Sequence, residues 1–270
     1  MKLQSSKNKF TNNALIKLYD KESLVKQKYA GRCVGTILKE CGKLIKSKTP
    51  NLSLKDLEQL TYLYTRNMDC IPTFLNYHGF PGAACISVNK QLVHGIPSDY
   101  ILQDGDVVSV DVGATFEGKI ADAARTWIYG DPISTEHVRL IDTCKNALKS
   151  AINKIEIGKH LGIIGYTIYN ETKNSGFGLI QHYGGHHLCD NVPHAETFIS
   201  NKSGQFDGNR MQIGEPMAIE PMLVLGKNVQ TKTLNDGWTV MTDDIGCHFE
   251  DTVVLMEDGV HLITGMSHED

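Results

Sequence analysis

The sequence contains no uninterrupted apolar run close to the roughly 18 residues that a membrane-spanning helix needs. Its N-terminus, MKLQSSKNKFTNNALIKLYD, contains lysines but lacks the apolar core of a signal peptide. These absences argue against a membrane protein and a secreted precursor. We therefore expect a cytoplasmic protein with no membrane partner.

Paired cysteines and basic clusters are also missing. The seven cysteines never form a Cys-x-x-Cys pair, which argues against a zinc finger and against a small disulfide-held secreted domain. No dense Lys/Arg block occurs beyond the first 30 residues, and the formal net charge is −4. Without a basic surface, we predict no direct binding of nucleic acid.

No low-complexity segment and no Pro/Gly/Ser-rich linker marks a domain boundary. With 270 residues and 41% hydrophobic side chains, the chain can bury a large core. We predict one domain over residues 13–270, preceded by a polar and loosely held arm over residues 1–12.

The hydrophobic pattern predicts an α+β fold. Apolar residues at helical spacing predict four helices, over residues 20–46, 54–67, 135–154 and 159–174. Pro50 ends the first helix and Ser53 stands at the N-cap of the second. Strand-like segments follow each helix pair, with turn signals such as Glu117-Gly118. This repeated order, with a period of about 110 residues, indicates two similar halves that can pair face to face.

Five acidic or histidine residues interrupt segments that otherwise read as apolar strands. They are Asp111 in VVSVDVG, Asp122 in IADAARTW, His186 in YGGHH, Glu220 in AIEPM and Glu250 in HFEDTVV. Buried charges need partners. Each residue alone has an ordinary explanation, such as an edge-strand carboxylate, a salt bridge to Arg125 or a hydrogen-bonded core histidine.

The five residues together favour a shared metal site. The turn at Glu117-Gly118 can aim Asp111 and Asp122 at one point, and the two glycines before His186 let the backbone approach a ligand closely. Four carboxylates that converge without cations would repel each other and take up protons. Two divalent ions explain the whole set, and oxygen donors with one imidazole suit Mn, Co, Fe or Zn. Such a pair of ions activates water for hydrolysis.

Longer motifs carry a resemblance to a known family. From about residue 30 to residue 264, the chain is similar to type I methionine aminopeptidases of the short bacterial form, in the segments YHGFPGAACISVN, VHGIPSD, DGDVVSVDVG, GGHH, AIEPM, NDGWTV and FEDTVV. The 34 residues from His186 to Glu220 leave no room for the helical insertion of the type II family. The resemblance implies the pita-bread fold, with two pseudo-symmetric halves of antiparallel strands backed by helices.

The resemblance also implies the activity. Enzymes of this family remove the initiator methionine from nascent polypeptides whose second residue is small, because a tight pocket after the scissile bond rejects bulk. The N-termini of nascent polypeptides would therefore be the partners of this chain. We expect a monomer, and the resemblance leaves contact with the ribosome open.

Carried over position by position, the resemblance assigns the ligands of two ions. Asp111 and Asp122 would hold the first ion, and Asp122 and Glu250 would bridge to the second. His186 and Glu220 would complete the second set. Glu220 would also carry a proton from the attacking water to the leaving amine.

Two further histidines match family positions at the substrate. His94 would contact the scissile amide, and His194 would steady the substrate carbonyl. His194 lies eight residues after His186, where relatives usually have seven, so HLCDNVP must absorb a one-residue insertion. If the insertion is placed differently, His187 takes the role of His194.

The methionine side chain would bind in an apolar and aromatic pocket. The matching positions are Tyr77, Phe80, Cys85 and Trp238. Three departures from the family pattern lie around the metal ligands: His187 stands where glycine is common, Ala218 where threonine is common and His248 where glutamine is common. They remove no ligand, but they can shift metal preference.

Two alternatives stand beside the main prediction. An X-Pro aminopeptidase or prolidase shares the fold and the five ligands but usually carries an additional N-terminal domain. A non-catalytic binding protein of the same fold would typically have lost ligands, whereas all five are present here.

Overall fold

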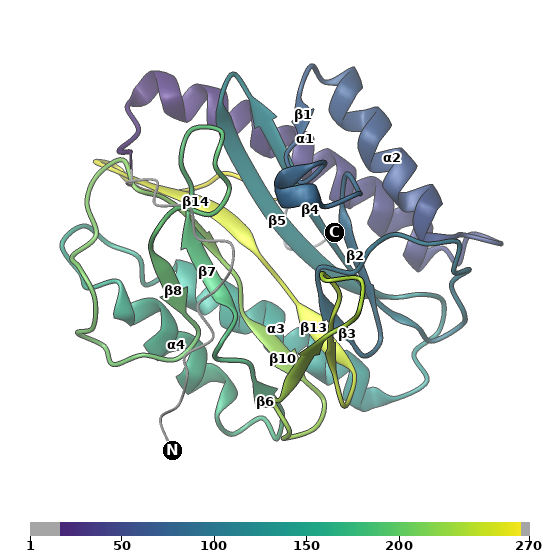
Figure 1. The fold of residues 1–270 in the computed structure, drawn as a ribbon. Coiled ribbons are helices and arrows are strands. Elements are labelled where there is room, and N and C mark those ends of the chain that lie inside the picture. The colour runs from purple at the N-terminus through teal and green to yellow at the C-terminus, as the bar shows by residue number, and fades with distance from the viewer. Residues whose placement is uncertain (1–16, 266–270) are drawn as a thin grey trace.

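The structure, a computed structural model, describes residues 17–265; the predicted arm over residues 1–12 lies outside this range. Its helices differ from the predicted ones only at their ends, and they are α1 (Lys21–Lys46), α2 (Leu54–Asn67), α3 (Thr135–Ile152) and α4 (Gly162–Thr172). Two helices open each half of the chain, as the repeated pattern predicted (Figure 1). No helix within residues 17–265 is both long and apolar enough to cross a membrane.

Local hydrogen bonds explain where the helices begin and end. Ser53 and Asp56 form a reciprocal capping box at the start of α2. α4 begins later than predicted because the backbone N–H groups of Leu161 and Gly162 donate to carbonyls of the segment 207–209 instead of standing free for a cap. α1 ends at Lys46, before Pro50, and the chain then turns through left-handed Lys48.

The strands of the first half surround one long hairpin. They are β1 (Ile71–Pro72), β2 (Cys85–Val88), β3 (Gln91–Val93), β4 (Val107–Phe116) and β5 (Lys119–Ile128). β4 pairs with β5 along one edge and with β1 and β2 along the other, always antiparallel. The turn that joins β4 to β5 consists of Glu117 and Gly118, both with positive φ, as a two-residue hairpin turn requires.

The second half has shorter strands. They are β6 (Gly178–Leu179), β7 (Gly184–His187), β8 (Phe198–Ser200), β9 (Pro216–Ile219), β10 (Met222–Val224), β11 (Thr231–Thr233), β12 (Val240–Thr242), β13 (Gly246–His248), β14 (Asp251–Met256) and β15 (Gly259–Leu262). Five of them form an antiparallel sheet in the order β15-β14-β9-β7-β8. β3 joins β12 and β11, so one strand of the first half pairs within the second.

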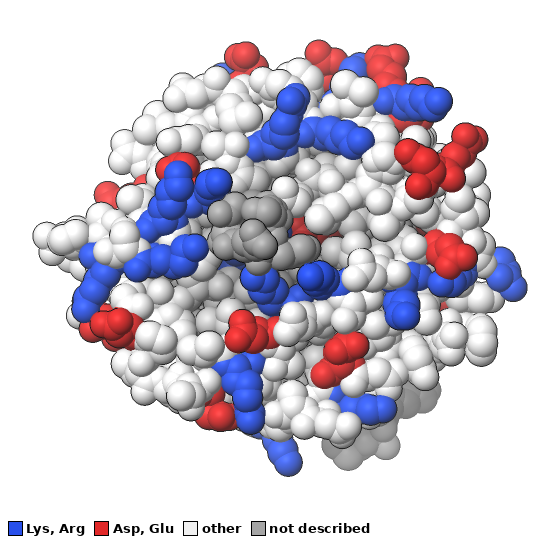
Figure 2. Space-filling model, turned by 180° about the vertical axis from the view of Figure 1, so that it is seen from behind, with Lys and Arg blue, Asp and Glu red and all other residues white. Residues whose placement is uncertain are grey.

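Each half buries its own hydrophobic core between strands and helices. One core joins α1 and α2 to β4 and β5, and the other joins α3 and α4 to β9, β10 and β14. In Figure 1, α1 and α3 lie behind the strands. Because strand side chains alternate between faces, residues between the core positions point away from the helices. On the face seen from behind, Lys and Arg side chains are interspersed with Asp and Glu (Figure 2).

The two halves are joined where β5 meets the segment before β14. Ala124 and Glu250 exchange both backbone hydrogen bonds (3.2 and 3.0 Å). The hydroxyl of Thr252 accepts from the backbone N–H of Asp122 and donates to its carbonyl oxygen, each at 2.8 Å. Two of the predicted metal ligands, Asp122 and Glu250, therefore lie at this joint.

Candidate metal centre

The β4–β5 hairpin places the two predicted aspartates on one face. Val110 and Val112 of β4 point into the first core, so Asp111 points to the opposite face. The hairpin register pairs Asp111 with Ala124 and Gly113 with Asp122, which makes the two aspartates diagonal neighbours.

The second half brings three predicted ligands to the same place from three segments. His186 lies in β7. Glu220 directly follows β9 and Glu250 lies between β13 and β14, so both glutamates stand at strand ends and not within strands. Alternation again sets their direction, because Ile219 and Phe249, the residues before them, point into the second core.

The glycines before His186 serve strand packing as well as the site. A Cβ on Gly185 would lie 2.3 Å from the carbonyl oxygen of Ala218 in β9, so this position needs glycine for the close approach of β7 and β9. Gly184 lines the pocket. The expectation that both glycines admit a ligand was therefore wrong for Gly185, whose space is taken by a neighbouring strand.

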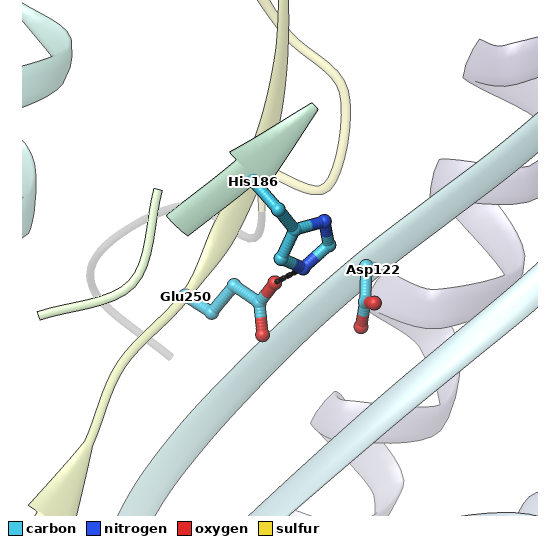
Figure 3. Close-up of side chains that lie close together, drawn as sticks. All are labelled: Asp122, His186 and Glu250. Atoms are coloured by element: carbon cyan, nitrogen blue, oxygen red, sulfur yellow. Dashed lines mark ion pairs between the residues drawn. The ribbon is translucent and has the colours of Figure 1, made fainter. Parts of the chain in front are cut away.

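Five side chains converge at one point, three of which are shown in Figure 3. Ligand atoms of Asp122, His186 and Glu250 all lie within 4.8 Å of one another. His186 Nε2 is 3.6 Å from Glu220 Oε1 and 3.7 Å from Glu250 Oε1. Two atoms bound to one ion at bond lengths of about 2.1 Å lie roughly 3.0–3.4 Å apart. The observed spacing is close to that of shared ligands.

Buried polar atoms in this cluster have no protein partner. Asp111 Oδ1, Asp122 Oδ1 and Glu250 Oε1 are buried without a hydrogen bond within residues 17–265. Arg125, which the sequence offered as a structural partner, pairs with Asp251 at 2.7 Å. Such unsatisfied carboxylate oxygens are costly unless a cation binds them. The residues therefore fit a site for divalent metal ions.

Burial and mutual repulsion determine the protonation of the metal-free cluster. Burial raises the pKa of Asp111 to about 7 and, with the charge of Asp111, raises the pKa of Asp122 well above its usual value. The pKa values of Glu220 and Glu250 are also raised, mainly by burial. Burial lowers the pKa of His186 to about 4, so this ring is neutral at neutral pH and can act as a ligand.

The loop that carries His194 is held against the first half. It makes a tight turn at Cys189–Val192, in which left-handed Asn191 donates its backbone N–H to the carbonyl oxygen of Gly118. Asp190 pairs with Lys119 of β5. The segment in which the sequence predicted a one-residue insertion is thus a compact, anchored turn.

The predicted substrate histidines differ from His187 in their surroundings. His94 and His194 line the main pocket, and the His194 ring lies 4.3 Å from that of His186. Burial lowers the pKa of His94 to about 4 and that of His194 well below its usual value. His187 lies 3.8 Å from Glu215 and lines a different pocket.

The four predicted methionine-pocket residues all line the same cavity as the metal ligands. Phe80, Cys85 and Trp238 pack in one apolar cluster, with the rings of Phe80 and Trp238 in edge contact at 5.1 Å. Tyr77 lies on another wall, stacked on His194 at 5.6 Å. The cavity has a volume of about 100 Å³, enough for several water molecules.

Sequence reasoning missed other residues of the cavity. They include Phe74, Val93, Tyr183, Phe198 and Met222, whereas His248, which the sequence analysis placed around the metal ligands, does line the cavity. Phe198 reaches the site because β8 pairs it with His186, and such a pairing is not visible in one sequence. The third departure, Ala218, is fully buried in β9 opposite His186 and Thr252, and does not line the cavity.

The chain is similar to known metallopeptidases. Residues 26–257 match metallopeptidase family M24. The chain is 35% identical to methionine aminopeptidase 1 of Bacillus subtilis over 237 residues, which cover 87% of this chain and 93% of that protein. It is 35% identical to the methionine aminopeptidase of Mycoplasma capricolum over 252 residues, covering 93% and 98%.

Solved structures give the same picture. The methionine aminopeptidase of Thermotoga maritima superposes with a TM-score of 0.88 at 32% identity, covering 93% of this chain and all of that one. The prolidase of Pyrococcus furiosus superposes with a TM-score of 0.71 at 19% identity, but only 66% of its length is covered. The similarity to the prolidase is therefore a similarity of fold alone.

Proposed function

The chain belongs to metallopeptidase family M24, and from this premise we propose that it is a methionine aminopeptidase that removes the initiator methionine from nascent polypeptides. The resemblance that the motifs predicted is confirmed, and so is the predicted α+β pita-bread fold. The X-Pro aminopeptidase or prolidase alternative is less supported, because the solved prolidase is longer and more distant in sequence.

One observation carries the proposal most directly. Carboxylates and an imidazole from both halves converge beside a small apolar pocket lined by Phe80, Cys85 and Trp238. A water-activating centre that shares one small cavity with apolar and aromatic side chains suits removal of a single apolar residue from a chain end. The aromatic edges and sulfur of the pocket suit a thioether.

We propose that the centre holds two divalent ions drawn from Co, Mn, Fe or Zn, with Asp111 and Asp122 at the first and His186 and Glu220 at the second. Asp122 and Glu250, which meet at the joint between the halves, would bridge the two. When bound, the ions would lower the pKa of a water molecule and polarise the peptide carbonyl.

The side chains of the protein perform the remaining steps. Glu220 accepts the proton of the attacking water and delivers it to the leaving amine, and burial, which raises the pKa of this carboxyl well above its usual value, makes it a better proton acceptor. His194 hydrogen-bonds the substrate carbonyl as negative charge develops there. His94, whose ring is in edge contact with that of Tyr183, contacts the scissile amide.

The wider setting follows from the activity. We propose that residues 13–270 act as one catalytic domain, as a monomer, in the cytosol, on chains whose second residue is small. Cosedimentation with ribosomes tests contact with them, and analytical ultracentrifugation tests the monomer.

The decisive experiment is a coupled assay of metal-stripped protein on Met-Ala-Ser and on an X-Pro peptide, with Mn, Co, Fe or Zn restored separately. The proposal expects metal-dependent release of methionine from the first peptide. Cleavage of the X-Pro peptide alone would move the function to the prolidase side. Inactivity on both would favour the non-catalytic binding protein.

A further inference from the structure

His248 is the least expected residue of the metal centre. It ends β13, two residues before Glu250, and strand alternation directs both side chains to the same face. Its neighbours Cys247 and Phe249 point into the second core. The ring is almost fully buried and lines the main cavity.

The ring of His248 mirrors that of His186 across the two glutamates. His248 Nε2 lies 3.3 Å from Glu220 Oε2 and 3.7 Å from Glu250 Oε2. His186 Nε2 lies at 3.6 and 3.7 Å from the Oε1 atoms of the same two carboxylates. Glu220, His248 and Glu250 accordingly form a second group whose ligand atoms lie within 4.8 Å of one another.

The available atom of this ring is a ligand-type nitrogen. His248 Nε2 is buried and has no hydrogen-bond partner within residues 17–265. The nitrogen faces two carboxylates, and an imidazole nitrogen that carries no hydrogen is a ligand of divalent metal ions. A buried nitrogen between two carboxylates needs a partner, and a shared cation supplies it.

The backbone holds His248 in place for this contact. Its N–H donates to Thr126 Oγ1 at 3.0 Å, and the Thr126 hydroxyl donates to its carbonyl oxygen at 2.7 Å. Thr126 lies in β5, the strand that carries Asp122. The ring is therefore fixed relative to the ligands of the first half.

We propose that His248 Nε2 is an additional metal ligand, so that each of the two ions receives one imidazole, from His186 at one ion and from His248 at the other. The inference rests on the proposed two-ion site. It adds a nitrogen donor beside the Oε2 atoms of Glu220 and Glu250, whereas His186 lies beside their Oε1 atoms. Nitrogen donors favour Zn and Co over Mn. The imidazole of His248, at a position where glutamine is common in the family, should therefore shift the metal preference of the site toward Zn and Co.

The test uses the whole protein with ¹⁵N-labelled histidine, loaded with two equivalents of ¹¹³Cd and observed by NMR. The inference expects two cadmium resonances, each coupled to one imidazole nitrogen. Two resonances of which only one is coupled to nitrogen would overturn the role of His248 while leaving the two-ion site standing. A single bound cadmium would overturn both, so the two failures are distinguishable.

A variant pair assigns the nitrogen. His248→Gln should remove one coupling and keep the other, whereas His187→Gln, whose ring faces Glu215 and a different pocket, should keep both. In competition titrations, His248→Gln should weaken Zn binding at one equivalent by at least about tenfold. Mn binding should weaken less, since Mn prefers oxygen donors. Equal losses for both metals would contradict the inference, and the wild-type spectrum decides it even if a variant folds poorly.

Discussion

The two halves of the molecule contribute to the metal centre in different ways. The first half places Asp111 and Asp122 inside two ten-residue strands joined by a two-residue turn. The second half places His186, Glu220 and Glu250 in or beside strands of three to six residues. A regular hairpin fixes two carboxylates, whereas several short strands let ligands of different kinds converge from separate segments.

This difference predicts a division of labour. The first half offers a cation two carboxylates, each with one buried oxygen that has no hydrogen-bond partner within residues 17–265. The second half also carries the two residues proposed to move the proton and to contact the substrate carbonyl, Glu220 and His194, whereas the first half carries His94, proposed to contact the scissile amide. Variants in the two halves should therefore fail in different ways.

The largest contrast is expected between Glu220→Gln and Asp111→Asn. Gln keeps the shape of Glu220 but cannot carry the proton, so turnover at saturating metal should fall about 10²- to 10⁴-fold. Asp111→Asn should mainly weaken metal binding, so excess metal should restore much of its turnover. Steady-state rates on Met-Ala-Ser across a range of metal concentrations separate the two. If excess metal restored the turnover of both variants, the proposed division of metal binding and proton transfer between the two halves would be wrong.

Within the second half, His194→Ala and His187→Ala form a matched pair. Loss of the carbonyl contact should lower kcat about 10²- to 10³-fold for His194→Ala, with a smaller change in KM. His187→Ala should keep a kcat near that of wild type, since His187 faces Glu215. Kinetics on folded variants of equal melting temperature check this. A loss of kcat for His187→Ala but not for His194→Ala would mean that the one-residue insertion between His186 and His194 had been aligned wrongly with the family.

Metal affinity should increase with pH, and both halves should contribute. Burial raises the pKa of Asp111 to about 7 and those of Asp122, Glu220 and Glu250 well above 3.8 or 4.5, so the metal-free cluster retains protons that a metal ion must displace. Each proton displaced changes the affinity about tenfold per pH unit. The rings of His186 and His248, with pKa values of about 4, release none near neutrality.

The same shifts set the stability of the metal-free protein. Carboxyls with raised pKa values stabilise the fold when they are protonated. Their contribution to the free energy of unfolding is therefore complete below pH 3.8–4.5 and is lost as pH rises through their pKa values in the folded protein.

The protons that a metal ion displaces can be counted by calorimetry of Mn binding at pH 6.5 in buffers of different ionisation enthalpy. Asp111→Asn and Glu220→Gln should each lower the count. Release of no protons by wild type would contradict the buried, protonated cluster.

The smallest contrast concerns packing. Gly185→Ala in the second half would place a Cβ 2.3 Å from a backbone oxygen of β9, and should lower the free energy of unfolding by about 1–3 kcal/mol. Gly113→Ala in the first half would meet the ring edge of Phe74 at 2.8 Å, and a ring can shift, so its loss should be smaller. Urea unfolding of the metal-free proteins measures both values. A larger loss for Gly113→Ala would show that the long hairpin is the more tightly packed region.

The two halves also differ in how far the sequence predicts them. The helical period, Ser53 as N-cap and the turn at Glu117-Gly118 were enough to predict α1, α2 and the hairpin with both aspartates facing one point. Each of these features depends on neighbours in sequence, where propensity and turn chemistry act.

The second half was harder to predict because its geometry depends on distant partners. The sequence placed Glu220 inside a strand-like segment, yet this residue directly follows the end of β9. The opposed positions of the His186 and His248 rings depend on how β7, β9 and β13 pack. This packing cannot be predicted from the spacing of the residues in the sequence. The family resemblance predicted that Tyr77 and Trp238 line the cavity, but it did not show that Tyr77 stacks on His194.

The central claim is that residues of both halves share one metal centre. Anomalous diffraction from crystals of the protein loaded with Mn tests it most directly. The account predicts two manganese peaks about 3.5–4 Å apart, each liganded by both Asp122 of the first half and Glu250 of the second. A single peak bound by residues of one half alone, or no peak at this joint, would contradict it.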